Sequence, residues 1–494
     1  MIWTSLSYFP YSRRMLKLFR FADLWNRKPL ENSAERIERA LLDRTRRLVA
    51  GLHVDDRFEN VTGSLTIARG RGKSLRVLYC DSVSQPIPDL IRSNCRDMVA
   101  ARVADQDFHS CIGELADVQS LVIDQLKLRA GKYVDRILAI SVVDPGLWQT
   151  DFDGVVSYTS LCDATRLAER TGISVIDGWP DRDIAVGGKG YPLDPLCMWL
   201  LQADRDRRIA RQVNISINVR QQTRGYLLPP SDGLDAEMPT LRPIATEGMS
   251  LIEGLLQLSS VESMSLEKAR QLLVSGVHSK ELLDQWKQLD SSDDNRTKAM
   301  LRIAAARINM SLTAEQLLCS AMKWIQVACQ DRIQDSMQQL RSEYARKRSE
   351  LQDEIESTPR LRKSGVGLLA AFDKSLPDFS APGNIVVDAP SPISDALVSR
   401  LQNHFAETQV TGSWGSQFPN ESAVPGSVDG PSLMAAMLGL MHIYQLPANV
   451  PALTGAQQQR ILGRLTPGRP NSWRNLLREM ADHEPSAMKL RDAV

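Results

Sequence analysis

The spacing of hydrophobic residues changes after about residue 220, and this change limits the folds that the chain can adopt. Short β-rich runs separated by amphipathic stretches fill the first 220 residues, at 47–54, 63–68, 74–80, 135–143, 173–177 and 212–219. Strands that alternate with helices indicate an α/β architecture. Residues 251–356 instead carry helical spacing throughout, and Thr313 with Gln316 forms a capping-box pattern at the start of the longest helix.

The composition is that of a globular chain with room for two or more domains. The chain has 494 residues, 43% of them hydrophobic and 24% charged, and a net charge of +1. A charge so close to zero gives no general attraction to nucleic acid, and we expect no such partner. Nothing approaches a run of about 20 apolar residues, so we expect no membrane span.

The cysteine pattern favours a reducing compartment. Seven cysteines occur without a C-x-x-C pair, and the six histidines are scattered. We therefore predict a cytoplasmic protein with neither a structural zinc site nor a disulfide framework, and no metal ligands are assigned. Residues 1–45 mix aromatic and basic side chains, which fits either a flexible or packed extension or an amphipathic surface-binding segment.

The most suggestive stretch for chemistry is "DRDIAVGGKGYPLDPL" at 181–196. It places Asp183 shortly before three glycines, Gly187, Gly188 and Gly190. A carboxylate beside backbone that a ligand can approach closely suits general-base chemistry. The same residues also suit a tight turn in which the aspartate accepts backbone hydrogen bonds, and the residues alone leave both interpretations open.

Three stretches in one order resemble the anhydro-N-acetylmuramic acid kinases. They are "LAERTGISVI" (167–176), "RDIAVGGKGYPLDPL" (182–196) and "LPANVPALTGA" (446–456), and with the β-rich start the resemblance covers about residues 46 to 470. It implies an α/β fold of two lobes, actin/hexokinase-like (ribonuclease H-like), with the large helical region in the second lobe. We expect residues 46–210 to form the first lobe, with 432–470 returning to it, residues 211–431 to form the second, and residues 471–494 to form a C-terminal tail.

The resemblance also implies a reaction and its residues. The family opens the 1,6-anhydro ring of a cell-wall amino sugar with water and phosphorylates its O6 with ATP and magnesium. By position, Asp183 is the base that activates the water, and Gly187, Gly188 and Gly190 line the sugar pocket. The family resemblance suggests a homodimer. The charged helix at 341–356 is the best candidate for a partner surface, although a solvated helix face is the default interpretation.

The nucleotide side departs from the family pattern. The small residues of the phosphate-binding turn are replaced in "GLHVDDRFENVT" (51–62): Gly51 remains, but Asp55, Asp56 and Glu59 bring negative charge. Such a cradle works through small residues and free backbone N–H groups. Four further nucleotide motifs are also degenerate, at 141–145, at 214–219, around Gly248 and at 389–391.

Two hypotheses of different classes follow. The first is an anhydro-sugar kinase whose ATP-dependent activity is impaired or lost, with degenerate cofactor-binding positions Gly51, Asp55, Asp56 and Glu59. The second is a non-catalytic sugar-binding or regulatory module on the same scaffold. The sugar-pocket interpretation requires Asp183 to face a cavity, and the degraded-site interpretation requires the turn at 54–57 to lie at the gap between the lobes.

Overall fold

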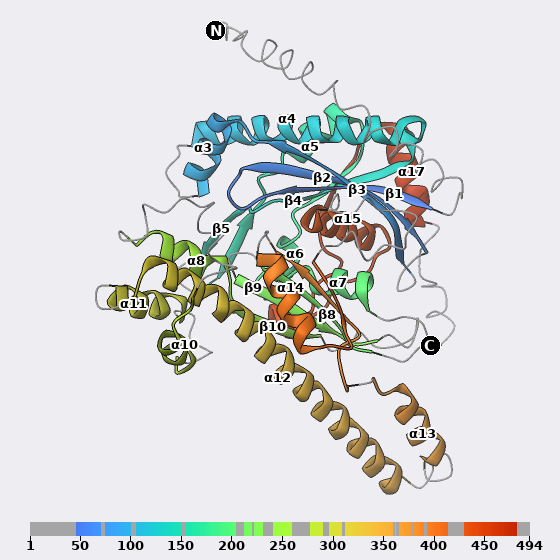
Figure 1. Ribbon diagram of the computed structural model, residues 1–494. Helices are drawn as coiled ribbons and strands as arrows, with labels where there is room; N and C mark the ends of the chain where they lie inside the picture. The colour runs from blue at the N-terminus through green and yellow to red at the C-terminus, as the bar shows by residue number, and fades with distance from the viewer. Residues whose placement is uncertain are drawn as a thin grey trace, which may run out of the picture.

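The structure of the protein is a computed structural model (Figure 1). It describes residues 46–70, 75–99, 105–150, 155–203, 212–219, 222–230, 241–258, 277–289, 296–308, 312–358, 361, 365–377, 379–389, 393–412 and 429–481. The expected extension at 1–45 and the last residues of the expected tail, 482–494, lie outside the described residues. In the described part of the chain, no helix is long and apolar enough to cross a membrane.

The first sheet is built from the β-rich runs near the start of the chain. Its strands are β13 (Arg464–Thr466), β7 (Val175–Asp177), β4 (Ile137–Val143), β1 (Arg47–Val54), β2 (Asn60–Arg69) and β3 (Arg76–Pro86), in that spatial order. β1, β2 and β3 form an antiparallel meander, whereas β4 pairs parallel to β1 and β7 parallel to β4.

The second sheet repeats the plan of the first. Its strands are β10 (Arg242–Glu247), β9 (Gln222–Leu228), β8 (Asn214–Val219), β11 (Asn384–Asp388) and β12 (Gln409–Thr411), in that spatial order. Again the first three strands in sequence form an antiparallel meander, and two parallel strands follow beside the first of them. The predicted α/β fold of two lobes is confirmed, and the repeated strand order gives its structural basis.

Helices cover both faces of the first sheet (Figure 1). On one face lie α3 (Asp89–Val99), α4 (Asp105–Ala130) and α5 (Ala164–Thr171), and on the other lies α15 (Gly430–Ile443). α15 packs so closely on β1 that a Cβ at Gly51 would lie 2.1 Å from the carbonyl oxygen of Ser432. Gly51 therefore permits close strand–helix packing, within β1 and not in the turn that follows it.

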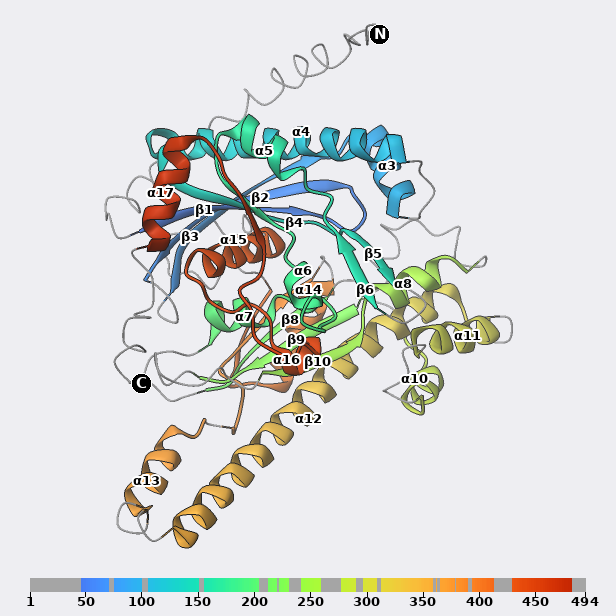
Figure 2. The ribbon, with the colours of Figure 1, turned by 180° about the vertical axis from the view of Figure 1, so that it is seen from behind.

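The second lobe carries the helical region that the sequence predicts. Its helices are α8 (Met249–Leu256), α10 (Lys280–Lys287), α11 (Arg296–Ile308), α12 (Ala314–Ser357), α13 (Gly365–Ser375) and α14 (Ile393–His404). The capping box of Thr313 and Gln316 is present at the start of α12. The first part of α12 packs on β10 and β9, and its distal part extends away from the sheets beside α13 (Figures 1 and 2).

A third core joins the two lobes. It combines α15 and α7 (Pro195–Gln202) with residues of both sheets, among them Val49 of β1 and Tyr226 of β9. The short helix α6 (Asp181–Ile184) also lies between the sheets, near the hairpin of β5 (Leu147–Thr150) and β6 (Val156–Thr159) (Figure 2). Two short C-terminal helices complete the described fold, α16 (Pro451–Thr454) and α17 (Pro470–Ala481), so part of the expected tail is a helix with Leu476 buried.

Candidate functional site

Asp183 lies in α6, which follows β7 after a short turn, and its side chain is fully buried. Its Oδ1 accepts hydrogen bonds from Asn449 Nδ2 at 2.7 Å and Thr454 Oγ1 at 2.9 Å. Its Oδ2 accepts a hydrogen bond from the backbone N–H of Gly190 at 2.9 Å. Three donors, two from the loop at 446–456 and one from the motif itself, therefore satisfy this buried carboxylate, as burial of such a group requires.

The glycines of the same motif wrap this carboxylate. Gly187 and Gly190 have φ values of +85° and +76°, in the left-handed region that glycine adopts without strain. A Cβ at Gly188 would lie 2.1 Å from Asp183 Oδ2. The glycines thus allow the backbone to approach a carboxylate closely. In this structure that carboxylate belongs to Asp183 of the same motif.

The loop at 446–456 closes over the motif from the other side. Lys189 donates its N–H to the carbonyl of Thr454, and Gln457 donates to the carbonyl of Val186, both at 2.9 Å. Asn449 and Thr454 are fully buried at this contact. Neither residue was predicted as part of the site, although both stand in the quoted stretch "LPANVPALTGA", and a buried carboxylate in a neighbouring motif is the signal that could have paired them with it.

The structure therefore brings Asp183, Gly188 and Gly190 together, with Gly187 in the same loop. It does not show the opening that the sugar-pocket interpretation requires, because the Asp183 side chain is 0% exposed. A general base must reach the water that it activates. The catalytic role of Asp183 and the sugar contacts of the three glycines stay predictions, and the contacts present here are those of a link between two loops.

Exposed aromatic rings lie next to the Gly190 loop. Trp148 of β5 and Tyr191 are 41% and 45% exposed, and their ring centroids lie 5.8 Å apart, edge to face. Arg224 of β9 places its guanidinium 5.8 Å from the Tyr191 ring centroid, which connects this cluster to the second lobe. A Cβ at Gly190 would meet the Trp148 ring at 3.0 Å, so the glycine allows the ring to pack on the loop.

The turn between β1 and β2 is closed on a single residue, Asp55. The backbone N–H groups of Arg57, Glu59 and Asn60 all donate to the Asp55 carboxylate, and the N–H of Phe58 donates to the Asp55 carbonyl. Four consecutive backbone donors, from 57 to 60, are thus used inside the turn. Phe58 is buried with φ +55°, an uncommon conformation for a bulky residue, and it anchors the turn in the first core.

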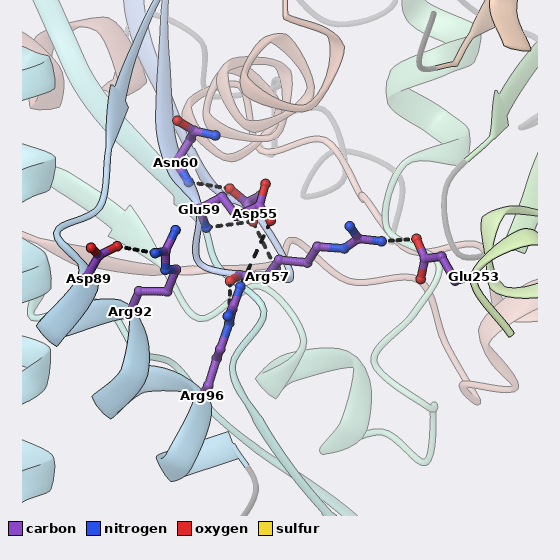
Figure 3. A network of polar contacts seen from close by, with 8 residues as sticks. All are labelled: Asp55, Arg57, Glu59, Asn60, Asp89, Arg92, Arg96 and Glu253. Atoms are coloured by element: carbon purple, nitrogen blue, oxygen red, sulfur yellow. Dashed lines mark hydrogen bonds and ion pairs between the residues drawn. The ribbon is translucent and has the colours of Figure 1, made fainter. Parts of the chain in front are cut away.

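The side chains of the turn reach both lobes (Figure 3). Arg57 forms an ion pair with Glu253 of α8, across to the second lobe. Arg96 of α3 donates from Nε to the Arg57 carbonyl at 2.9 Å, and its guanidinium lies 4.0 Å from Glu59. The turn therefore lies where the lobes meet, as the degraded-site interpretation requires, whereas Asp56 is exposed and Asp55 points back into its own turn.

The other degenerate segments are occupied by the protein's own contacts where the structure describes them. In 141–145, Asp144 accepts hydrogen bonds from Tyr158 Oη at 3.1 Å, Ser160 Oγ at 2.8 Å and the Leu161 N–H at 3.0 Å. Burial nevertheless raises the pKa of Asp144, because the low dielectric disfavours its charged form. Gly248 is the N-cap residue of α8, and Pro390 and Ser391 lie outside the described residues.

These residues do not fit ATP and magnesium. The N–H groups that would hold phosphate are bonded to Asp55, and the carboxylates of the turn carry the same sign of charge as a triphosphate. Among the described residues, no group of three or more histidine, cysteine, aspartate or glutamate side chains could hold a metal ion.

Comparisons with known proteins match the first lobe. The family model described as "Anhydro-N-acetylmuramic acid kinase" matches residues 66–221. An "Anhydro-N-acetylmuramic acid kinase" of Synechococcus elongatus is 28% identical over 125 residues, which are 25% of this chain and 32% of that protein. The match thus spans about a third of the length of this curated relative. The range of the family model includes the motif around Asp183.

Solved structures of sugar kinases give weaker matches. A ROK hexokinase from Thermus thermophilus matches at 15% identity with a TM-score of 0.27, and covers 79% of this chain and 97% of that one. A ROK family glucokinase from Streptomyces griseus in complex with glucose and AMPPNP gives 13% identity and a TM-score of 0.24, with the same coverage. Scores this low carry no structural argument, so the fold rests on the repeated strand order of the two sheets.

The family match and the matching curated relative agree with the resemblance that the sequence motifs carry. Residues 66–221 of the chain are therefore similar to the anhydro-N-acetylmuramic acid kinase family.

Proposed function

We propose that the protein is an anhydro-N-acetylmuramic acid kinase-like protein that has lost the ATP-dependent ring opening and phosphorylation of its relatives. One observation carries this proposal: Asp55 accepts all four backbone N–H groups from Arg57 to Asn60. A phosphate-binding turn works because its N–H groups are free to point at the anion. Here the protein supplies its own anion.

Charge adds to this internal competition. A triphosphate at the turn would meet Asp55, Asp56 and Glu59. Each pair of like unit charges 4 Å apart costs about 1 kcal/mol in water and about 4 kcal/mol at an effective dielectric of 20. Phosphoryl transfer depends on positioning the phosphates and neutralising their charge. The described turn adds negative charge near the phosphates and leaves none of its N–H groups from 57 to 60 free to hold them.

The test is a direct assay of ring opening and of phosphorylation. The protein is incubated with 1,6-anhydro-N-acetylmuramic acid and magnesium ATP, and the products are followed by mass spectrometry. We expect no phosphorylated sugar above a control without protein, and no change in Tm with magnesium ATP. Turnover that Asp183→Asn abolishes would overturn the proposal and support the impaired-kinase alternative with Asp183 as its base.

A retained sugar-binding function is the second candidate, and the exposed rings beside the Gly190 loop favour it. Trp148 and Tyr191 present apolar surface at the junction of the lobes. Aromatic side chains in solvent are typical of ligand-contact surfaces. Titration with the anhydro sugar should change the Trp148 fluorescence, and Tyr191→Ala should weaken that response. An unchanged Tm and fluorescence at saturating sugar would exclude this candidate.

The cytoplasmic location and the homodimer are also proposals, and they rest on the cysteine pattern and on the resemblance to the family. The seven cysteines are all buried and none of them is in a disulfide, which is compatible with a reducing compartment. Sedimentation velocity of the full chain measures the oligomeric state, and a concentration-independent monomer would contradict the homodimer.

A further inference from the structure

Two buried cysteines meet where α3 crosses α4. Cys95 of α3 and Cys111 of α4 have their sulfur atoms 3.2 Å apart, and their side chains are 0% and 1% exposed. The sulfurs of a disulfide lie about 2.05 Å apart, so an approach of roughly 1 Å separates this pair from a covalent bond. Both residues belong to the same hydrophobic core, which holds the two helices together.

The two thiols are chemically unequal. The hydrogen bond with Cys111, followed by burial, raises the pKa of the Cys95 thiol. The same hydrogen bond lowers the pKa of the Cys111 thiol. By contrast, burial raises the pKa of Cys80 and of Cys329 to about 12. Because a thiolate is the reactive form of cysteine, these directions favour Cys111 as the nucleophile of a pair whose sulfur atoms are already in contact.

We propose that Cys95 and Cys111 form a peroxide-sensitive dithiol site that closes to a disulfide between α3 and α4. The co-reactant is hydrogen peroxide, which is small enough to enter a buried site during local opening of the two helices. The Cys111 thiolate attacks one peroxide oxygen, and after protonation the other oxygen leaves as water, so that Cys111 becomes a sulfenic acid. The Cys95 sulfur then attacks the Cys111 sulfur, and the hydroxyl leaves with the Cys95 proton as a second water.

The site is connected to the Asp55 turn through the next residue of α3. Arg96 follows Cys95 and donates to the Arg57 carbonyl, and its guanidinium approaches Glu59. A disulfide would fix α3 on α4 and so hold Arg96 in place. We therefore expect the amide hydrogens of residues 57–60 to exchange more slowly in the oxidised protein than in the reduced protein.

The experiment uses the full chain, reduced and then treated with hydrogen peroxide while folded. Non-reducing peptide mapping should show one new link, between the peptides that contain Cys95 and Cys111, with the other five cysteines still reduced. In Cys95→Ser the second step is blocked, so Cys111 should accumulate as a sulfenic acid that dimedone labels. Cys80→Ser is the matched control: it removes a buried thiol that contacts Thr66 instead of a cysteine, and it should leave the link unchanged.

Two results would overturn the proposal. One is a folded protein that keeps seven free thiols after peroxide treatment, although the same protein unfolded in urea forms disulfides. The other is dimedone labelling in Cys95→Ser that falls on cysteines other than Cys111. An amide exchange rate at 57–60 that does not change on oxidation would reject the connection to the turn.

Discussion

Two aspartates, one in each half of the expected cleft, differ in their burial and in the sequence distance to their hydrogen-bond donors. Asp183 is fully buried, and two of its three donors, Asn449 and Thr454, lie 266 and 271 residues away in the sequence. Asp55 is only partly buried, and its carboxylate takes all three of its donors from the next five residues. The first carboxylate joins distant segments, whereas the second closes a local turn.

This difference in hydrogen-bond partners predicts how sequence changes would affect the Asp183 motif and the Asp55 turn. A buried carboxylate that takes donors from its own loop and from a distant loop constrains both loops, because removal of a partner leaves a buried polar group short of a hydrogen bond. A turn whose backbone N–H groups bond to its own aspartate constrains only its own few residues. It needs no external ligand to satisfy those N–H groups. The two carboxylates therefore differ in how far along the chain their contacts reach.

The largest effect is expected for Asp183→Asn. The new amide group would face N–H and O–H donors, so we expect a loss of about 3 kcal/mol in the free energy of unfolding. Urea denaturation measures it. The control is Asp181→Asn, whose carboxylate is partly exposed and 3.8 Å from Arg464, and which should change the stability by about 0.5 kcal/mol or less. Equal losses in the two variants would show that the burial of Asp183 adds nothing to its contribution to stability.

Thr454→Val tests one long-range partner of Asp183 while keeping the side-chain shape. The buried Oδ1 would lose one of its two donors, and we expect a loss of about 1 to 2 kcal/mol in the free energy of unfolding. Thr62→Val is the matched control, since its hydroxyl contacts Ser84 at an exposed position and its loss should be close to neutral. A Thr454→Val protein as stable as the control would show that Asn449 and Gly190 satisfy Asp183 without Thr454.

Asp55→Ala tests the local carboxylate. Three N–H groups lose their acceptor, but water reaches this turn, so the expected loss is about 1 kcal/mol, as for removal of a helix cap. Asp56→Ala, at an exposed neighbour for which no contact is seen, should leave the unfolding midpoint unchanged. A loss as large as that of Asp183→Asn would mean that the Asp55 turn supports contacts far from it in the sequence, which its local hydrogen bonds do not predict.

The smallest effect is expected for Glu253→Gln, which removes the ion pair with Arg57 between the lobes. The two side chains are 28% and 50% exposed, so the expected loss is about 0.5 kcal/mol, and it should vanish in 1 M salt, where charges are screened within about 3 Å. Thermal unfolding at low and high salt checks both statements. A loss that persists at high salt would indicate that Glu253 contributes through packing.

Much of the fold could be predicted from local patterns. The three strands of the first meander, the α12 capping box at Thr313 and the buried helix α15 all follow from periodicity and end signals that their own residues carry. The hairpin of β5 and β6 and the strands β9 and β10 were not predicted. The β5 and β6 strands are only four residues long, and such short segments carry no clear period.

The sequence by itself determined the α/β class, the glycine motif around Asp183 and the acidic residues of the turn at 55–59, because each of these features is carried by neighbouring residues. Only the tertiary structure decided that Asn449 and Thr454 close over Asp183, that Gly51 serves helix packing, and that Asp55 points into its own turn. The physical reason is that burial and hydrogen-bond partners depend on segments hundreds of residues apart, and no local pattern specifies which of them meet.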